Sequence, residues 1–239
     1  MKPTASSPVV LLPGLDGTDV LYRPLIRALS PDTHVEVIEY PTGGARSYDD
    51  AVRHASERLS EWPRCHIVGW SFSGPVALRL ARAHPERVRS VTLAATFVEA
   101  PLRSLRVVAP LMQPALVGLV RTIRRLPIWL GRRADDPKRR DKAELWRRVG
   151  ARTLAARARA ISKVDARGDL AAVTQPMQYL APREDRIVPP RNLQQICAIR
   201  GDVEVIALDG DHFAPYDDPE ACAAVIRAFV ARAEDDVAT

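Results

Sequence analysis

Cysteine is scarce in this sequence. The 239 residues contain three, Cys65, Cys197 and Cys222, and none of them forms a C-x-x-C pair. A small odd number of cysteines does not build a disulfide framework. We therefore expect a reducing compartment and all three side chains buried as small hydrophobic groups.

Long apolar stretches are also missing. No run approaches the roughly 20 apolar residues of a membrane-spanning helix, and the short one near the N-terminus is too short for a secretory signal. No cluster has metal-ligand spacing, and the glycines of residues 13–17 lack the Lys-Ser/Thr of a phosphate loop. We expect a cytoplasmic protein with no membrane span, metal or cofactor.

The composition fits a folded domain that is poor in aromatic residues. Aromatic residues make up 5% of the chain, hydrophobic residues 46% and charged residues 27%. Such values exclude global disorder and allow one sizeable core. We expect a single domain over residues 1–239.

Apolar strand patterns alternate with helical patterns along most of the chain. We expect strands at 9–12, 34–40, 65–70, 88–96, 177–182 and 203–208, and helices at 21–30, 47–60, 73–84, 189–199 and 218–233. Such alternation predicts an α/β fold with a mostly parallel sheet of about six strands, flanked by helices. Residues 101–170 interrupt it with helical patterns alone. Because ligands bind at the carboxyl ends of parallel strands, we expect this insertion to be a helical lid over the site.

The stretch "IVGWSFSGP", residues 67–75, joins an expected strand to an expected helix. A nucleophilic serine on such a tight turn needs small neighbours two residues away on each side. Ser71 satisfies this requirement through Gly69 and Ser73, whereas Ser73 has Pro75 as its neighbour. Pro75 is well tolerated in the first turn of a helix that starts after Ser71. Ser71 is therefore the candidate nucleophile.

The segment "GWSFSGPVALRLARAHPERVRSVTLAAT" resembles the α/β-hydrolase family and is similar to its small-ester carboxylesterases. The resemblance covers residues 8–100 and 175–230. Serine replaces the usual last glycine of the family's pentapeptide. The resemblance implies a Ser-Asp-His triad in that chain order.

His212 is the candidate base. It follows the expected strand at 203–208 through the loop "DGDHF", at the edge of the sheet where Ser71 should lie. A serine hydroxyl becomes nucleophilic when such a base removes its proton. We expect the other four histidines, His34, His54, His66 and His84, to be structural or solvated.

Asp185 is the candidate acid. It lies in "LAPREDRIVPP", which resembles the family's G-x-x-D-x-x-V-P loop with Pro182 in place of the glycine. Glu184 and Asp211 are the rival carboxylates. Glu184 should point elsewhere, and Asp211 is adjacent to His212, where local geometry rarely allows contact with Nδ1.

Two backbone amides complete the expected site by holding the oxyanion. The first belongs to Phe72, after the nucleophile. The second is implied by the resemblance and belongs to Leu15, in the turn "LPGLDGTD". The family usually has His-Gly where this chain has Pro13-Gly14, which leaves the Leu15 amide untouched.

Glycines 14 and 17 flank that amide. We expect Gly14 and Gly17 to allow close approach of the backbone, and Asp16 to be a turn residue rather than a catalytic one.

The insertion carries most of the positive charge. Residues 101–170 contain 18 lysines and arginines against 6 acidic residues, while the whole chain has a net charge of +6. This charge is typical of a solvated lid surface, or it attracts an acidic acyl carrier, an acyl-CoA or a membrane surface; no motif for nucleic acid accompanies it. Apolar residues of the insertion are candidates to line an acyl pocket: Leu111, Met112, Leu116, Leu119 and Trp129.

Together these features predict hydrolysis of a carboxylic ester or thioester through an acyl-Ser71 intermediate. Two alternatives remain open. One is an acyltransferase that uses the same triad, and the other is a non-catalytic binding protein that kept the fold.

Overall fold

The computed structural model of the chain describes residues 7–43, 46–102, 104–105, 109, 113–115, 118 and 137–238. Six strands form one sheet in the order β2-β1-β3-β4-β5-β6, and all neighbouring pairs are parallel. They are β1 (Val9–Leu12), β2 (Val35–Val37), β3 (Cys65–Trp70), β4 (Val88–Ala94), β5 (Met177–Pro182) and β6 (Glu204–Leu208). The predicted α/β fold with about six parallel strands is confirmed.

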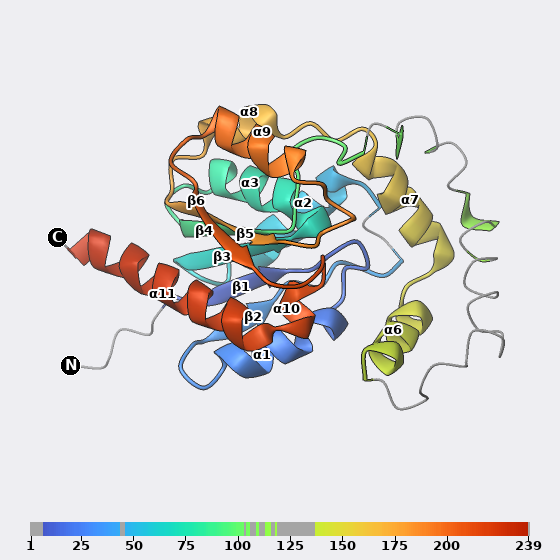
Figure 1. Cartoon of the computed structure of the whole chain (residues 1–239), viewed down its shortest axis with the longest axis horizontal. Coiled ribbons are helices and arrows are strands. Elements are labelled where there is room, and N and C mark those ends of the chain that lie inside the picture. The colour runs from blue at the N-terminus through green and yellow to red at the C-terminus, as the bar shows by residue number, and fades with distance from the viewer. Residues whose placement is uncertain are drawn as a thin grey trace.

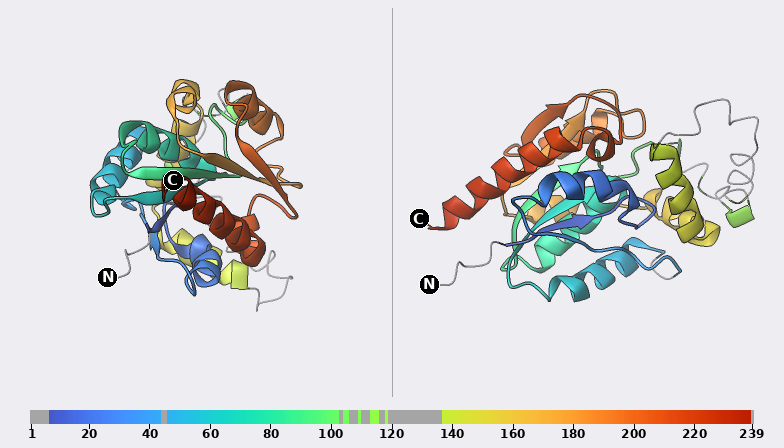
Figure 2. Two further views of the ribbon diagram at one scale, coloured as in Figure 1. Left: turned by 90° about the vertical axis from the view of Figure 1, so that its left-hand side faces the viewer. Right: turned by 90° about the horizontal axis from the view of Figure 1, so that it is seen from below.

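Helices cover both faces of this sheet (Figures 1 and 2). One layer contains α1 (Arg23–Leu29) and α11 (Pro219–Ala238), with the short η1 (Val20–Tyr22) and α10 (Ala214–Asp217) beside them. The other contains α2 (Tyr48–Leu59), α3 (Gly74–Ala83), α8 (Arg167–Ala172) and α9 (Arg191–Ile199). The sheet is therefore the middle of three layers.

The strands are apolar on both sides because both faces are covered. In β1, Val10 and Leu12 belong to the core beneath α2 and α3, whereas Val9 and Leu11 belong to the core beneath α1 and α11. All four side chains are fully buried. This alternation explains why β1 appears in the sequence as a continuous apolar run.

Two predicted strands are shorter than expected. The strand expected at 34–40 ends at Val37. The Ile38 amide still donates to the Leu11 carbonyl of β1, but the Tyr40 amide donates to the Gly17 carbonyl in the loop after β1. The strand expected at 88–96 ends at Ala94, since Ala95 has a φ of 45°. The loops after both strands contact the turn that carries Ser71.

The helices agree with the sequence patterns within one or two residues, apart from α11, which continues to Ala238. The helix expected at 21–30 is divided into η1 and α1, and the sequence patterns did not predict α10. Helix α2 begins with a capping box in which the Ser47 hydroxyl accepts from the Asp50 amide and the Asp50 carboxylate accepts from the Ser47 amide. This arrangement satisfies two backbone donors that a helix start otherwise leaves unpaired.

The segment between β4 and β5 places α6 (Pro137–Arg148) and α7 (Ala151–Ile161) beyond the carboxyl ends of the strands, opposite both termini (Figure 1). Ion pairs join α6 to the rest of the fold: Arg23 contacts Glu144 at 2.7 Å, and Arg148 contacts Asp19 at 2.6 Å and Glu39 at 2.7 Å. Part of the insertion's positive charge is therefore neutralised within the molecule.

Other parts of the predicted insertion lie outside the described residues. They include the candidate pocket residues Leu111, Met112, Leu116, Leu119 and Trp129. Among the helices in the described ranges, none combines the length and the apolar character that crossing a membrane requires.

Candidate active site

Ser71 lies on the turn between β3 and α3, through the single turn η2 (Ser71–Ser73). Its φ of 54° falls in the left-handed region, which non-glycine residues rarely adopt. A Cβ on Gly69 would lie 2.7 Å from the Ser73 carbonyl oxygen and 2.8 Å from the Ala77 Cβ. The turn therefore excludes a side chain at position 69, as the small-neighbour requirement predicted, and Pro75 lies in the first turn of α3.

Ser73 is a small neighbour of Ser71 and also makes two hydrogen bonds through its hydroxyl. Its side chain is fully buried, and its hydroxyl donates a hydrogen bond to the Pro13 carbonyl and contacts the Tyr40 hydroxyl at 2.6 Å. Tyr40 is the donor in the second bond, because the Ser73 proton is already used. Ser73 thereby ties the turn that carries Ser71 to the loop after β1.

A second support of the turn comes from Thr96, just after β4. Its hydroxyl donates to the Ser71 carbonyl at 2.5 Å, and its backbone is held by the Tyr179 hydroxyl. A Cβ on Gly74 would lie 2.1 Å from the Thr96 Oγ1, so the close contact requires glycine there. The sequence did not predict the contact between Thr96 and Gly74, because no local sequence pattern links the two residues.

His212 reaches Ser71 from the loop after β6. Its Nε2 lies 2.9 Å from the Ser71 Oγ, and 5% of the residue is exposed. The Trp70 indole N–H donates to the His212 carbonyl at 3.1 Å, which fixes the loop from the residue before Ser71. Sequence reasoning also missed this role of Trp70.

Asp185 contacts the other nitrogen of the same imidazole. The His212 Nδ1 lies 2.8 Å from Asp185 Oδ2, while Asp185 Oδ1 accepts bonds of 2.8 Å from the amides of Ile187 and Val188. A carboxylate at Nδ1 places the ring proton there and leaves Nε2 as the acceptor that faces Ser71.

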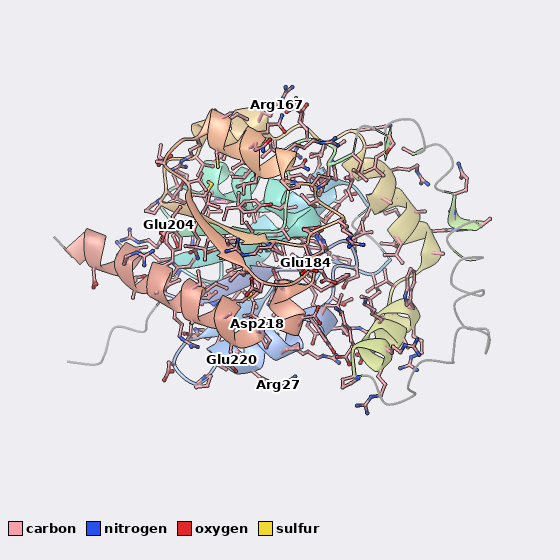
Figure 3. The ribbon with its side chains drawn as sticks, in the orientation of Figure 1. Arg27, Arg167, Glu184, Glu204, Asp218 and Glu220 are labelled. Atoms are coloured by element: carbon pink, nitrogen blue, oxygen red, sulfur yellow. The ribbon has the colours of Figure 1, made fainter. Side chains whose placement is uncertain are left out.

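The rival carboxylates are placed differently. Glu184 is exposed beside the end of β5 (Figure 3), and Asp211 accepts from the Phe213 amide of its own loop. The structure thus brings together the three side chains named from the sequence, Ser71, His212 and Asp185.

The other histidines have partners elsewhere in the fold. His34 contacts Glu36, His54 contacts the Glu39 carbonyl, and His84 contacts Ser56. His66 is buried between Ser90 and Glu234, each at 2.8 Å, and burial lowers its pKa against the opposing effect of Glu234. These contacts agree with the structural roles expected from the sequence.

The loop after β1 is closed on itself by three internal bonds. The Gly17 amide donates to the Gly14 carbonyl at 3.0 Å, and Asp16 accepts from both the amide and the hydroxyl of Thr18. Asp16 is therefore a turn residue, as expected. Its burial raises the pKa of the carboxyl group, and the Thr18 bonds oppose that change.

The two glycines of this loop behave differently. Gly17 has a φ of 76°, and a Cβ there would lie 2.4 Å from a nitrogen of Arg157. A Cβ on Gly14 would meet nothing closer than 3.7 Å, so the expected close approach holds for Gly17 and is wrong for Gly14 within this chain.

Within the ranges that the structure describes, no three histidine, cysteine or acidic side chains gather in a group that could hold a metal ion. The three cysteines are free thiols. Burial raises the pKa of Cys65 and of Cys222 to about 12, whereas Cys197 is partly exposed, contrary to the expectation for that residue.

A family comparison accounts for this arrangement. The model of the alpha/beta hydrolase family matches residues 9–225, which is most of the chain. The chain belongs to the alpha/beta hydrolase family. The match includes the turn at Ser71 and the loops of Asp185 and His212.

Individual relatives are distant. A pimeloyl-[acyl-carrier protein] methyl ester esterase of Aeromonas hydrophila is 30% identical over 94 residues, which cover 37% of each chain. A putative carbamate hydrolase of Azorhizobium caulinodans is 30% identical over 98 residues, again 37% of each. The matches thus span less than two-fifths of these curated relatives. A hydrolase structure from Pseudomonas aeruginosa shares the fold with a TM-score of 0.75 at 21% identity, covering 95% of this chain and 91% of that one.

Proposed function

We propose that the chain is a serine hydrolase that cleaves a carboxylic ester or thioester. The observation that carries this proposal is the pair of hydrogen bonds that runs from Asp185 through His212 to Ser71, at 2.8 and 2.9 Å. Nucleophile, base and orienting acid in such contact have the geometry of acyl-transfer catalysis.

In the proposed reaction the Ser71 Oγ attacks the substrate carbonyl carbon while His212 Nε2 accepts the hydroxyl proton. His212 then gives that proton to the leaving alcohol or thiol as the tetrahedral intermediate collapses to acyl-Ser71. In the second half of the cycle His212 deprotonates a water molecule that attacks the acyl carbon, and it then gives this proton to Ser71 Oγ as the acid is released. Asp185 stabilises the imidazolium in both halves, and no step requires a cofactor.

The backbone amides of Leu15 and Phe72 are the proposed donors to the oxyanion. In a planar trans peptide the carbonyl and the N–H point in opposite directions. Because the Gly14 carbonyl accepts from the Gly17 amide inside the loop, the Leu15 N–H points out of it. The Phe72 amide directly follows Ser71, and stacking of its ring on Tyr48 at 4.4 Å supports its position.

Hydrolysis of p-nitrophenyl esters and acyl thioesters, measured for wild type and Ser71→Ala, tests this proposal. We expect turnover by wild type and none above background for the variant. A fluorophosphonate probe should label wild type at Ser71. A natively folded wild type that neither turns over nor accepts the label would indicate a non-catalytic binding protein, and product formation with an added alcohol in place of hydrolysis would indicate an acyltransferase.

The finer proposal is that the acyl group arrives on an acidic acyl carrier. A cavity of about 440 Å³ lies between α2, α3 and α7, and four cations line it: Arg46, Arg79, Arg159 and Lys163. Asp49 is the acidic residue in that lining. The aligned segment of the pimeloyl-[acyl-carrier protein] methyl ester esterase gives this proposal its second support. The segment between β4 and β5 then acts as a lid that also presents positive charge.

Kinetics on a carrier-bound ester test the finer proposal. We expect the double substitution Arg159→Gln and Lys163→Gln to raise KM for that substrate and to weaken its dependence on salt, because exposed charges are screened. Arg232→Gln is the matched control, since Arg232 pairs with Glu204 at the far edge of the sheet. Hydrolysis of small esters should be the same for the double variant and wild type. An equal KM of the two proteins for the carrier-bound ester would refute the proposal of an acidic carrier.

A further inference from the structure

Arg157, on α7, is a fully buried arginine in the segment where the sequence predicted solvated charge. A guanidinium keeps its proton inside a protein and loses hydration when it is buried, so it requires partners that compensate. Burial lowers the pKa of Arg157, while Tyr40 and Asp16 act in the opposite direction. The buried charge of Arg157 is therefore compensated by the groups that surround it.

Those groups belong to the loop after β1 and to its neighbour. Arg157 Nη1 donates to the Leu15 carbonyl at 3.1 Å and to the Asp16 carbonyl at 2.6 Å. Nη2 donates to the Pro41 carbonyl at 3.2 Å, and the guanidinium carbon lies 5.5 Å from the centre of the Tyr40 ring. One side chain from α7 thus holds two loops of the sheet's carboxyl edge.

Arg157 supplies the donors for two carbonyls of the loop after β1, in addition to the bonds within the loop. Between residues 14 and 17 each carbonyl has a partner: Gly14 accepts from Gly17, Gly17 accepts from Tyr40, and the two between them accept from Arg157. Removing Arg157 leaves the carbonyls of Leu15 and Asp16, which directly follow the Leu15 amide, without this donor. The glycine at 17 leaves room for the guanidinium, since a Cβ would lie 2.4 Å from Nη1.

We infer that Arg157 is a positioning residue for the oxyanion hole, one that fixes the Leu15 amide through the carbonyls that follow it. This inference rests on the proposed function. It makes α7 part of the catalytic framework, because Arg157 joins α7 to the loops at the carboxyl edge of the sheet. Thr153, one turn earlier on α7, adds a second contact with these loops, because its hydroxyl donates to the Thr42 carbonyl at 2.7 Å.

The test compares Arg157→Met and Arg157→Lys with a matched control, Arg148→Met. Arg148 also joins this segment to the core, through Asp19 and Glu39, and within the described part of the chain it makes no bond to the carbonyls of residues 14–17. Met removes the donors at similar length, while Lys keeps the charge but offers its donors from a single point. Loss of one oxyanion donor costs roughly 10²–10³ in rate, so loss of its positioning should cost about 10–10².

We expect Arg157→Met to lower kcat by that factor with KM within about threefold, because the contact acts on the transition state. Inhibition by a trifluoromethyl ketone, whose adduct with Ser71 carries an oxyanion, should weaken by the same factor as kcat/KM. Arg157→Lys should lie between wild type and Met. Arg148→Met should keep kcat within about twofold. An Arg157→Met enzyme that loses thermal stability but keeps kcat and inhibitor affinity would overturn the inference.

Hydrogen exchange of the peptide that covers residues 14–18 gives a readout independent of activity. Exchange should be at least about tenfold faster in Arg157→Met than in wild type or Arg148→Met, since the loop opens locally. Unchanged exchange would overturn the inference even in an active enzyme. A wild type without turnover or fluorophosphonate labelling would instead refute the proposed function, and faster loop exchange would still establish the structural half of the inference.

Discussion

Replacing Ser73 by alanine should destabilise the fold far more than the loss of one hydroxyl normally does. The residue is fully buried and its oxygen has two partners, the Pro13 carbonyl and the Tyr40 hydroxyl. Alanine leaves both partners buried without a bond, and each such group costs about 1–3 kcal/mol. We therefore expect a loss of roughly 2–6 kcal/mol in the free energy of unfolding.

Urea titration followed by circular dichroism measures that loss. The midpoint should fall while the slope stays the same, because the surface exposed on unfolding hardly changes. Ser30→Ala is the control: the Ser30 hydroxyl also donates to a carbonyl, that of Ile26, but at an exposed position. We expect its effect to stay within about 0.5 kcal/mol. Equal midpoints for the two variants would refute the reasoning.

A double-mutant cycle with Tyr40→Phe identifies the partner. If the Ser73 and Tyr40 hydroxyls bond to each other, removing both leaves fewer unpaired groups than the two single changes imply. The double variant should then lose about 1 kcal/mol less than the sum of the singles. Strict additivity would show that the 2.6 Å contact has no energetic coupling.

Three further predictions concern the triad, the turn and the response to pH. Asp185→Asn should keep the fold but lower kcat by about 10⁴, measured on the best ester of the panel, because the imidazole loses its orienting charge; activity within tenfold of wild type would contradict this role. Gly74→Ala should cost about 1–3 kcal/mol in urea unfolding through its clash with Thr96, and Thr96→Ala in the same chain should restore part of it. Because burial depresses the pKa of His66 in the fold, the unfolded state binds the extra proton: this contribution to stability is complete above about pH 6.5 and is lost as the pH falls below it. Glu234→Gln removes the opposing interaction, so its unfolding free energy should fall more steeply than that of wild type between pH 7 and 5.5, within a limit of about 1.4 kcal/mol per pH unit; parallel pH profiles would disprove the assignment.

The sequence was sufficient to select the three side chains of the proposed triad as neighbours, because each of them follows its own strand. Ser71, Asp185 and His212 come after β3, β5 and β6, and parallel strands bring their carboxyl ends to one edge. The local pattern near each residue was enough to select it. The distances of the hydrogen bonds that join these three side chains are set by the fold, and no further feature of the sequence indicates them.

The supports of the triad were beyond the sequence for a physical reason. Thr96 on Ser71, Trp70 on His212 and Arg157 on the loop after β1 are contacts between segments far apart in the chain. No periodicity marks such a pair. The sequence also predicted a solvated surface for the positive charge of this segment, Arg157 included, because arginine is rarely buried without partners. In the fold the partners of Arg157 are backbone carbonyls, which every residue carries and no sequence pattern marks.

Two departures from the family's usual pattern meet in one contact. The sequence has Pro13 where the family usually has histidine, and Ser73 where its pentapeptide usually ends in glycine. In the fold the Ser73 hydroxyl donates to the Pro13 carbonyl. A glycine at position 73 would satisfy the steric requirement of the turn but would leave this carbonyl without that donor. The bond joins the turn that carries Ser71 and Phe72 to the loop that carries Leu15, so the two amides proposed to hold the oxyanion are fixed relative to each other. The serine that first looked like an imperfect motif is therefore a connection between the two halves of the proposed oxyanion hole.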